Sequence, residues 1–267
     1  NVYGALGAML VPMLVPILAL AVGWRATFLI AGGLGSIWVL GWMLSSRWIL
    51  ETASAEVGAP ANEARVGVRA VLADRATWAV AGGKVFSDQM YWFLVFWMPD
   101  LLRREFGLGM GGVGAPLAVI AGVTALGGLA GGYASSRLLD RGMAPTKARR
   151  LIMLACALLA LALPAVLHTS SVWIAVSLLC LVMAAHQGFS VNLFALTADI
   201  TALPRVATTI GVAAFFGNLS GMFVLQASGW MLQNHYGYGP LLAFLAVSYL
   251  IALGWIQAWL PRKRTPS

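Results

Sequence analysis

The sequence predicts an all-α, polytopic membrane protein with eight transmembrane helices. Of its 267 residues, 60% are hydrophobic and only 10% are charged, whereas a soluble domain carries about 25% charged residues. The apolar residues gather in runs of about 20, the length of helix that crosses a bilayer core of about 30 Å. They do not alternate with polar residues over about ten positions, as the strands of a membrane barrel do. This composition excludes a disordered chain and argues against a soluble enzyme.

The expected spans follow one another with short connections, apart from one longer polar segment. The fifth is the shortest. The first is not expected to be a signal peptide, because no basic segment precedes it and a second run follows almost at once. The expected spans are 2–22, 26–44, 78–101, 113–133, 151–167, 172–196, 206–231 and 241–260.

The basic residues indicate how the spans are oriented. Thirteen of the 17 Lys and Arg fall on one side of the expected spans, and three fall on the other. Because positive residues collect on the cytoplasmic side, that side and both chain ends are expected to be cytoplasmic. The net charge of +8 does not indicate nucleic-acid binding, because these residues form no basic stripe. The cytoplasmic set is Arg47, Arg65, Arg69, Arg75, Arg137, Arg141, Lys147, Arg149, Arg150, Arg205, Arg262, Lys263 and Arg264, and the outer set is Arg25, Arg103 and Arg104.

One long polar segment, 45–77, divides the chain unevenly. Expected spans 2–22 and 26–44 precede it, and all the others follow it. The chain opens at Asn1 inside an apolar run, with no initiator Met. We therefore expect a fragment or a truncated gene product with further spans upstream.

Four stretches of the sequence resemble a known family. Gly-Trp-Arg-Ala-Thr-Phe at 23–28 and Gly-Tyr-Ala-Ser-Ser-Arg-Leu-Leu-Asp-Arg-Gly at 132–142 resemble a helix start and a cytoplasmic loop motif of the major facilitator superfamily. Two further stretches resemble its anion:cation symporter family and, within it, the hexuronate transporters. They are Lys-Val-Phe-Ser-Asp-Gln-Met-Tyr-Trp-Phe at 84–93 and Ala-His-Gln-Gly-Phe-Ser-Val-Asn-Leu-Phe at 185–194.

The resemblance implies a major facilitator fold that lacks its first four helices. Residues 1–44 would be the last two helices of the N-terminal bundle, 45–77 the central cytoplasmic loop, 78–260 the C-terminal six-helix bundle and 261–267 a cytoplasmic tail. It further implies a secondary active transporter of the bacterial inner membrane. Such a protein carries out proton-coupled symport of organic anions, above all hexuronates or related sugar acids, by alternating access. The family's main proton-coupling acids and anion-binding arginines lie in the missing helices.

Polar residues within the third expected span are candidates for the site. Lys84 and Asp88 lie at i and i+4 on one helix face, where they form either a structural ion pair or a gate that attracts a carboxylate. Tyr91 and Trp92 follow, and their rings either pack on a sugar or fill the helix interface. A charge at bilayer depth costs about 2.5–3.5 kcal/mol on insertion scales. Lys84 and Asp88 are therefore expected to have either a structural partner or a functional role.

The sixth and seventh spans add further candidates. Gln187 and Ser190 are expected to contact substrate, whereas Asn192 points away and is expected to bond a neighbouring helix. His186 either titrates and couples to protons or stays neutral in an interhelical hydrogen bond. Asn218 is expected to contact substrate through its amide, with interhelical bonding as the alternative.

The cytoplasmic loop motif departs from the family pattern. Ser136 stands where the family has an acid before Arg137, and Asp140 lies one turn later as a possible substitute. We expect the motif's charged residues Arg137, Asp140 and Arg141, together with Asp199 after the stretch at 185–194, to form gating contacts or ion pairs.

Other classes of function find little support in the sequence. There is no phosphate-binding GxxxxGK[ST] loop, and His168, His186 and His235 lack partners at metal-ligand spacing. We therefore expect no cofactor, no metal and no catalytic set, which argues against a membrane-embedded enzyme. The alternatives that stay open are a major facilitator exporter of drugs or metabolites and a truncated product that transports nothing.

Overall fold

The computed structural model describes residues 2–56, 67–109 and 111–260, with the backbone alone for residues 2–6, 8–9, 12 and 47–56. Every regular element in this part of the chain is helical, so the all-α prediction is confirmed there. The elements are α1 (Val2–Glu56), α2 (Val68–Leu72), α3 (Arg75–Phe106), α4 (Gly114–Asp140), α5 (Pro145–Ala160), the 3-10 helix η1 (Leu163–His168), α6 (Val172–Ile200), α7 (Leu203–Gln233) and α8 (Gly239–Trp259).

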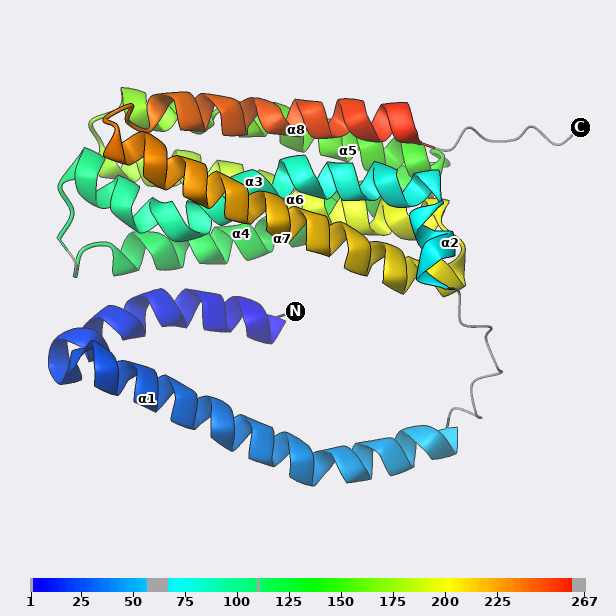
Figure 1. The fold of residues 1–267 in the computed structure, drawn as a ribbon, viewed down its shortest axis with the longest axis horizontal. Helices are drawn as coiled ribbons and strands as arrows, with labels where there is room; N and C mark the ends of the chain where they lie inside the picture. The colour runs from blue at the N-terminus through cyan, green and yellow to red at the C-terminus, as the bar shows by residue number, and fades with distance from the viewer. Residues whose placement is uncertain (1, 57–66, 110, 261–267) are drawn as a thin grey trace, which may run out of the picture.

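Helices α3 to α8 form an antiparallel bundle (Figure 1). Local signals fix where each helix begins and ends. The Asp74 carboxylate accepts a hydrogen bond from the backbone N–H of Ala76 (3.0 Å) and caps the start of α3. Gly107 adopts a left-handed φ of 67° and ends it, a conformation that glycine allows at little cost. The turns therefore reverse the chain at alternate ends of the bundle.

Six helical segments of the described chain are long and apolar enough to cross a membrane: Met13–Ser46, Gly114–Asp140, Pro145–His168, Val172–Ile200, Leu203–Gln233 and Gly239–Trp259. The expected count of eight stays a prediction. Helix α3 is not among the six, and its Lys84, Asp88 and Asp100 lower its hydropathy.

Helix α1 consists of two arms that meet at Gly23, whose φ of 82° and ψ of 157° are not helical. The expected spans 2–22 and 26–44 fall in these two arms. Thr27 donates a hydrogen bond to the Gly23 carbonyl (3.0 Å) and steadies the start of the second arm. The chain reverses direction here, and the first arm lies beside α4 (Figure 1).

The polar segment 45–77 differs from the connecting loop that the sequence predicts. The second arm of α1 continues as helix to Glu56, since no Gly or Pro interrupts the chain before Gly58. Helix α2 and the first turn of α3 occupy its far end. Residues 57–66 and the expected tail 261–267 lie outside the described residues.

The helical segment at the expected fifth span, Pro145–His168, is longer than the apolar run 151–167 that predicts it. Helix α5 starts at Pro145. Proline is tolerated at this position, because the N–H that it lacks would have no partner in the first turn of a helix. The chain then continues through η1, which carries Pro164 in its first turn. Because proline cannot donate to a preceding carbonyl, the α-helix ends before it and a tighter helix completes the span.

Small residues let the helices of the bundle approach closely. A Cβ added to Gly131 on α4 would lie 2.6 Å from the Cα of Gly188 on α6. A Cβ added to Gly217 on α7 would lie 2.5 Å from the Asp88 carboxylate of α3. Both glycines therefore lie in close helix contacts, and at Gly131 the neighbouring atoms belong to backbone, as the small-xxx-small spacing in the sequence indicates.

We expect Gly131→Ala to lower the thermal stability of the detergent-purified protein, because the new methyl group meets backbone that cannot move aside. Overpacking of this kind costs about 1–3 kcal/mol. The matched control is Gly254→Ala in α8, where nothing lies within 4 Å of the added Cβ. The control should be neutral or slightly stabilising, because alanine favours helix by about 1 kcal/mol over glycine. Equal melting temperatures for the two variants would contradict the close α4–α6 contact.

Candidate functional site

A buried ion pair joins Lys84 and Asp88 on α3. The Lys84 ammonium lies 2.8 Å from the Asp88 carboxylate, and each side chain is less than a tenth exposed. The Phe194 ring of α6 lies under the ammonium at 5.0 Å, and Gly217 of α7 leaves room for the carboxylate. The i and i+4 spacing in the sequence correctly indicates one helix face. The structure adds that three helices enclose the pair.

The side chains of Tyr91 on α3 and His186 on α6 are in contact. Their rings stack with centroids 4.7 Å apart and an interplanar angle of 16°. His186 is buried, and its Nδ1 shares a hydrogen bond with the hydroxyl of Tyr249 on α8. Tyr249 in turn donates to the backbone carbonyl of Ser87 (3.0 Å).

This chain of hydrogen bonds assigns the proton on His186. The Tyr249 hydroxyl has one proton, and it is donated to Ser87. Nδ1 of His186 must therefore carry a hydrogen and donate it to the Tyr249 oxygen. In the neutral form of the ring, Nε2 is then left with a free lone pair. The imidazole thus holds the Tyr91 ring in place between α3, α6 and α8.

An open groove of about 680 Å³ lies between α3 and α7. Its volume is in the range of about 300–1,000 Å³ usual for small-molecule sites. Trp92 is close to the Cα of Gly221, where any larger residue would collide with its indole ring. The ring also stacks on Phe96 at 6.0 Å. The groove is lined by Trp92, Phe96, Trp97, Asp100, Asn218, Gly221, Met222, Leu225 and Gln226.

The structure brings only some of the predicted substrate contacts together. Trp92 and Asn218 share the groove, and the Asn218 side chain is exposed to it. Gln187 instead packs against Gly128 of α4, and Ser190 is buried in α6. Asn192 bonds a neighbouring helix as expected, because its amide nitrogen donates to the Gly131 carbonyl (3.1 Å).

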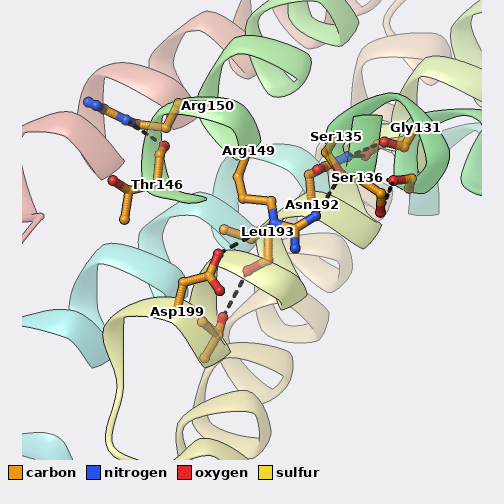
Figure 2. A network of polar contacts seen from close by, with 12 residues as sticks. Gly131, Ser135, Ser136, Thr146, Arg149, Arg150, Asn192, Leu193 and Asp199 are labelled. Atoms are coloured by element: carbon orange, nitrogen blue, oxygen red, sulfur yellow. Dashed lines mark hydrogen bonds and ion pairs between the residues drawn. The ribbon is translucent and has the colours of Figure 1, made fainter. Parts of the chain in front are cut away.

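A polar network ties α4, α5 and α6 at the end of the bundle where α5 begins (Figure 2). Arg149 of α5 donates to the Ser135 hydroxyl of α4 (2.6 Å). The same guanidinium lies 3.4 Å from the Asp199 carboxylate of α6. Its side chain is 15% exposed, so the arginine is largely enclosed by the three helices.

The loop motif makes different contacts from those its residues suggest. Arg137 donates to the Tyr133 hydroxyl (2.7 Å) one turn earlier. Within the described residues, Arg137, Asp140 and Arg141 take part in no ion pair, and all three are exposed. Asp140 therefore does not replace the missing acid, and the ion pair of Asp199 is made by Arg149.

A second polar cluster lies at the other end of the bundle, where it ties the C-terminal end of α3 to the start of α8. One oxygen of Asp100, Oδ2, accepts from the Tyr238 hydroxyl (2.6 Å) and lies 2.7 Å from the Arg104 guanidinium. Burial and this hydrogen bond raise the pKa of Tyr238 well above its usual value. The phenol therefore remains a donor at any physiological pH.

Sequence reasoning missed several residues of these clusters. Arg149 and Tyr249 find their partners 50 and 63 residues away, and no local pattern announces them. Asp100 carried a signal, because Arg104 follows it at i+4 in the same way that Asp88 follows Lys84. Groups of three or more metal-ligating side chains do not occur among the residues that the structure describes.

Comparisons with known proteins agree on one family. The Major Facilitator Superfamily matches residues 1–225. The hexuronate transporter of Escherichia coli K12 is 24% identical over 284 residues, which cover 100% of this chain and 64% of the relative. The probable galactarate/D-glucarate transporter of the same strain is 26% identical over 70% of this chain and 42% of its own length. The chain thus spans less than two thirds of each of these relatives.

Further comparisons extend the likeness. The D-galactonate transporter of Escherichia coli O6:H1 is 25% identical over 92% of this chain and 63% of the relative. Among solved structures, an outward-facing bacterial homologue of the iron transporter ferroportin superposes with a TM-score of 0.65 at 16% identity, covering 91% of this chain and 59% of that chain. That likeness shows the fold. The family and the long apolar helices indicate a multi-pass membrane protein, and the relatives are named as transporters.

We expect Lys84→Gln and Asp88→Asn each to lower the melting temperature of the purified protein strongly. Removing one partner of a buried pair leaves an uncompensated charge, at a cost of about 3–5 kcal/mol. The double variant should recover much of the loss, because neither charge then remains. Arg104→Gln is the control, since that arginine is 60% exposed and surface pairs contribute at most about 1 kcal/mol. Additive single losses in the double variant would contradict a coupled buried pair.

Proposed function

The chain belongs to the Major Facilitator Superfamily, and on that premise we propose that it forms part of a secondary active transporter for sugar acids. It corresponds to helices five to twelve, with eight membrane spans. Residues 1–44 end the N-terminal bundle, 45–77 connect the halves and 78–260 form the C-terminal bundle. The observation that carries the proposal is that relatives with different names are all transporters of sugar acids.

Hexuronates are the substrates we favour, moved together with protons by alternating access. The match to the hexuronate transporter runs the full length of this chain, which supports hexuronates over the other acids. A transporter of this superfamily binds substrate near the membrane midplane, between its two halves. The C-terminal bundle would then supply one wall of the site, and four further helices would supply the proton-coupling acids and the principal anion-binding arginines.

The groove between α3 and α7 is the part of that wall whose side chains are best suited to bind a sugar. Asn218 offers two donors and an acceptor for hydroxyl groups, and the Trp92 ring offers an apolar face for the C–H side of the molecule. Tyr91 and His186 keep the neighbouring rings in place. Gln187 and Ser190 complete the wall from α6 in this proposal. Lys84 and Asp88 provide a charge pair that can respond to the substrate's carboxylate.

The same proposal places the chain in the inner membrane with both ends in the cytoplasm. The described basic residues support this orientation. At one end of the bundle lie Arg69, Arg75, Arg137, Arg141, Lys147, Arg149, Arg150 and Arg205, while Arg103 and Arg104 lie at the other.

We expect labelling of single cysteines in intact cells to follow this orientation. Ser170→Cys, between η1 and α6, should react with a membrane-impermeant maleimide, whereas Ala144→Cys, between α4 and α5, should react only after the membrane is opened. Both positions are exposed, and the native Cys156 and Cys180 are buried, so background labelling should be low. Labelling of Ala144→Cys from outside would overturn the orientation.

We expect Asn218→Ala, in the complete transporter, to weaken hexuronate binding by about ten- to a hundredfold, because the bound sugar loses a hydrogen-bonding partner worth about 1–3 kcal/mol. Uptake of radiolabelled D-galacturonate into proteoliposomes with an imposed proton gradient measures the change. Asn234→Ala is the matched control, since that amide lies just past the C-terminal end of the same helix, does not line the groove and donates to the Trp230 carbonyl of its own helix.

Two outcomes would count against this function. Uptake that is saturable but independent of the proton gradient would contradict symport. Export of a lipophilic cation, with no uptake of any sugar acid, would favour a drug exporter instead. An unchanged affinity in Asn218→Ala would remove that residue from the site.

A further inference from the structure

We propose that the outer seam between α5 and α8 binds an anionic phospholipid at the end of the bundle where α5 begins and α8 ends. Lys147 and Arg150 of α5 hold the phosphate of the lipid, and its acyl chains lie along the apolar surface that continues from them. This site is separate from the groove between α3 and α7, so the inference goes beyond the transport of sugar acids.

The Arg150 side chain is fixed across the seam. In Figure 2 it extends away from the neighbouring Arg149 network, and its Nε donates to the Thr146 carbonyl one turn earlier (3.0 Å). Its Nη1 donates to the side-chain oxygen of Gln257 on α8. A guanidinium has five N–H donors, so the others have no acceptor among the described residues. The protein therefore positions this group and leaves most of its donors available.

This end of the seam carries positive charge that no acid offsets within the described residues. Lys147 is exposed and lies one turn before Arg150, on the same face of α5. Neither residue takes part in an ion pair in the described chain, whereas Arg149 and Arg205 are paired with acids. Two such cations attract an anionic phosphodiester more strongly than a zwitterionic headgroup, whose ammonium offsets the phosphate charge.

An apolar stripe continues from Arg150 along the exposed side of α5. Leu154 and Leu158 follow it at i+4 and i+8 on the same helix face, and each is more than 40% exposed. On α8, Gly254 lies one turn before Gln257, and nothing lies within 4 Å of a Cβ added there. A headgroup at Arg150 therefore places its acyl chains against leucines, beside an open surface of α8.

The seam stays accessible within the described chain. The first arm of α1 lies beside α4, on the other side of the bundle from α8 (Figure 1). Basic pockets between transmembrane helices are typical binding sites for anionic headgroups, whereas an apolar surface alone would accept any lipid. The fixed arginine, the unpaired charge and the adjoining leucines together favour an anionic phospholipid.

The test measures binding of dioleoylphosphatidylglycerol to the detergent-purified protein by native mass spectrometry. Dioleoylphosphatidylcholine, which has the same acyl chains and no net charge, is the comparison lipid. The wild-type protein should bind the anionic lipid more tightly. Lys147→Gln and Arg150→Gln should each weaken that binding by about fivefold, and neither should change the binding of phosphatidylcholine.

Gln257→Glu is the sharper variant, because it keeps an acceptor for Arg150 and adds a carboxylate that offsets its charge. It should weaken binding of the anionic lipid as much as Arg150→Gln does, with a melting temperature at least as high as that of the wild-type protein. Arg69→Gln is the matched control for the loss of one charge, since that arginine is exposed on α2, which packs on α3 and α7.

Three outcomes would overturn the inference. Equal affinity of the wild-type protein for the two lipids would remove the preference for negative charge. A loss in Arg69→Gln as large as that in Arg150→Gln would indicate attraction to the basic end of the bundle as a whole. Displacement of phosphatidylglycerol by inorganic phosphate would indicate a site for free anions. None of these measurements depends on transport, so a failure of the proposed function would leave their outcome distinguishable.

Discussion

Close approach of helix backbones is the constraint on which the rest of the structure depends. Lipid removes most of the hydrophobic drive for helices to associate, so contact surfaces must fit closely. Gly131 and Gly188 let α4 meet α6, and Gly217 and Gly221 let α7 meet α3. The Asp88 carboxylate and the Trp92 ring both occupy space that these glycines leave empty. The ion pair and the groove wall are therefore products of the same packing.

The bundle separates its polar groups into two kinds. Most of those in the interior have partners, as in the chain from His186 through Tyr249 to the Ser87 carbonyl, while Gln89 Oε1, Asn192 Oδ1 and Thr201 Oγ1 are buried without one among the described residues. Those of the groove, such as Asn218 and one oxygen of Asp100, are left without partners among the described residues. Buried polar groups without partners are costly, so a groove that keeps them accessible is suited to a polar ligand.

The sequence predicted the positions of the long apolar helices but not the contacts between them. Hydropathy located the apolar runs, and i to i+4 spacing identified the Lys84–Asp88 pair, because both signals are local. The ends of helices were harder, since α1 continues to Glu56 through polar residues that simply lack a breaker. Long-range partners such as Arg149 for Asp199 could not be predicted, because no single-sequence pattern joins residues on different helices. Family resemblance pointed to Asn218 but not to Asp100.

The reversal at Gly23 has a consequence for the order of biosynthesis. The first arm of α1 is made before its main neighbour within this chain, α4, which begins at Gly114. At about 5–20 residues per second, on the order of 5–20 s separate the two during translation. Over that interval the arm has no α4 to pack against. Insertion of the arm into the bilayer therefore precedes its contact with α4, and that contact forms inside the membrane.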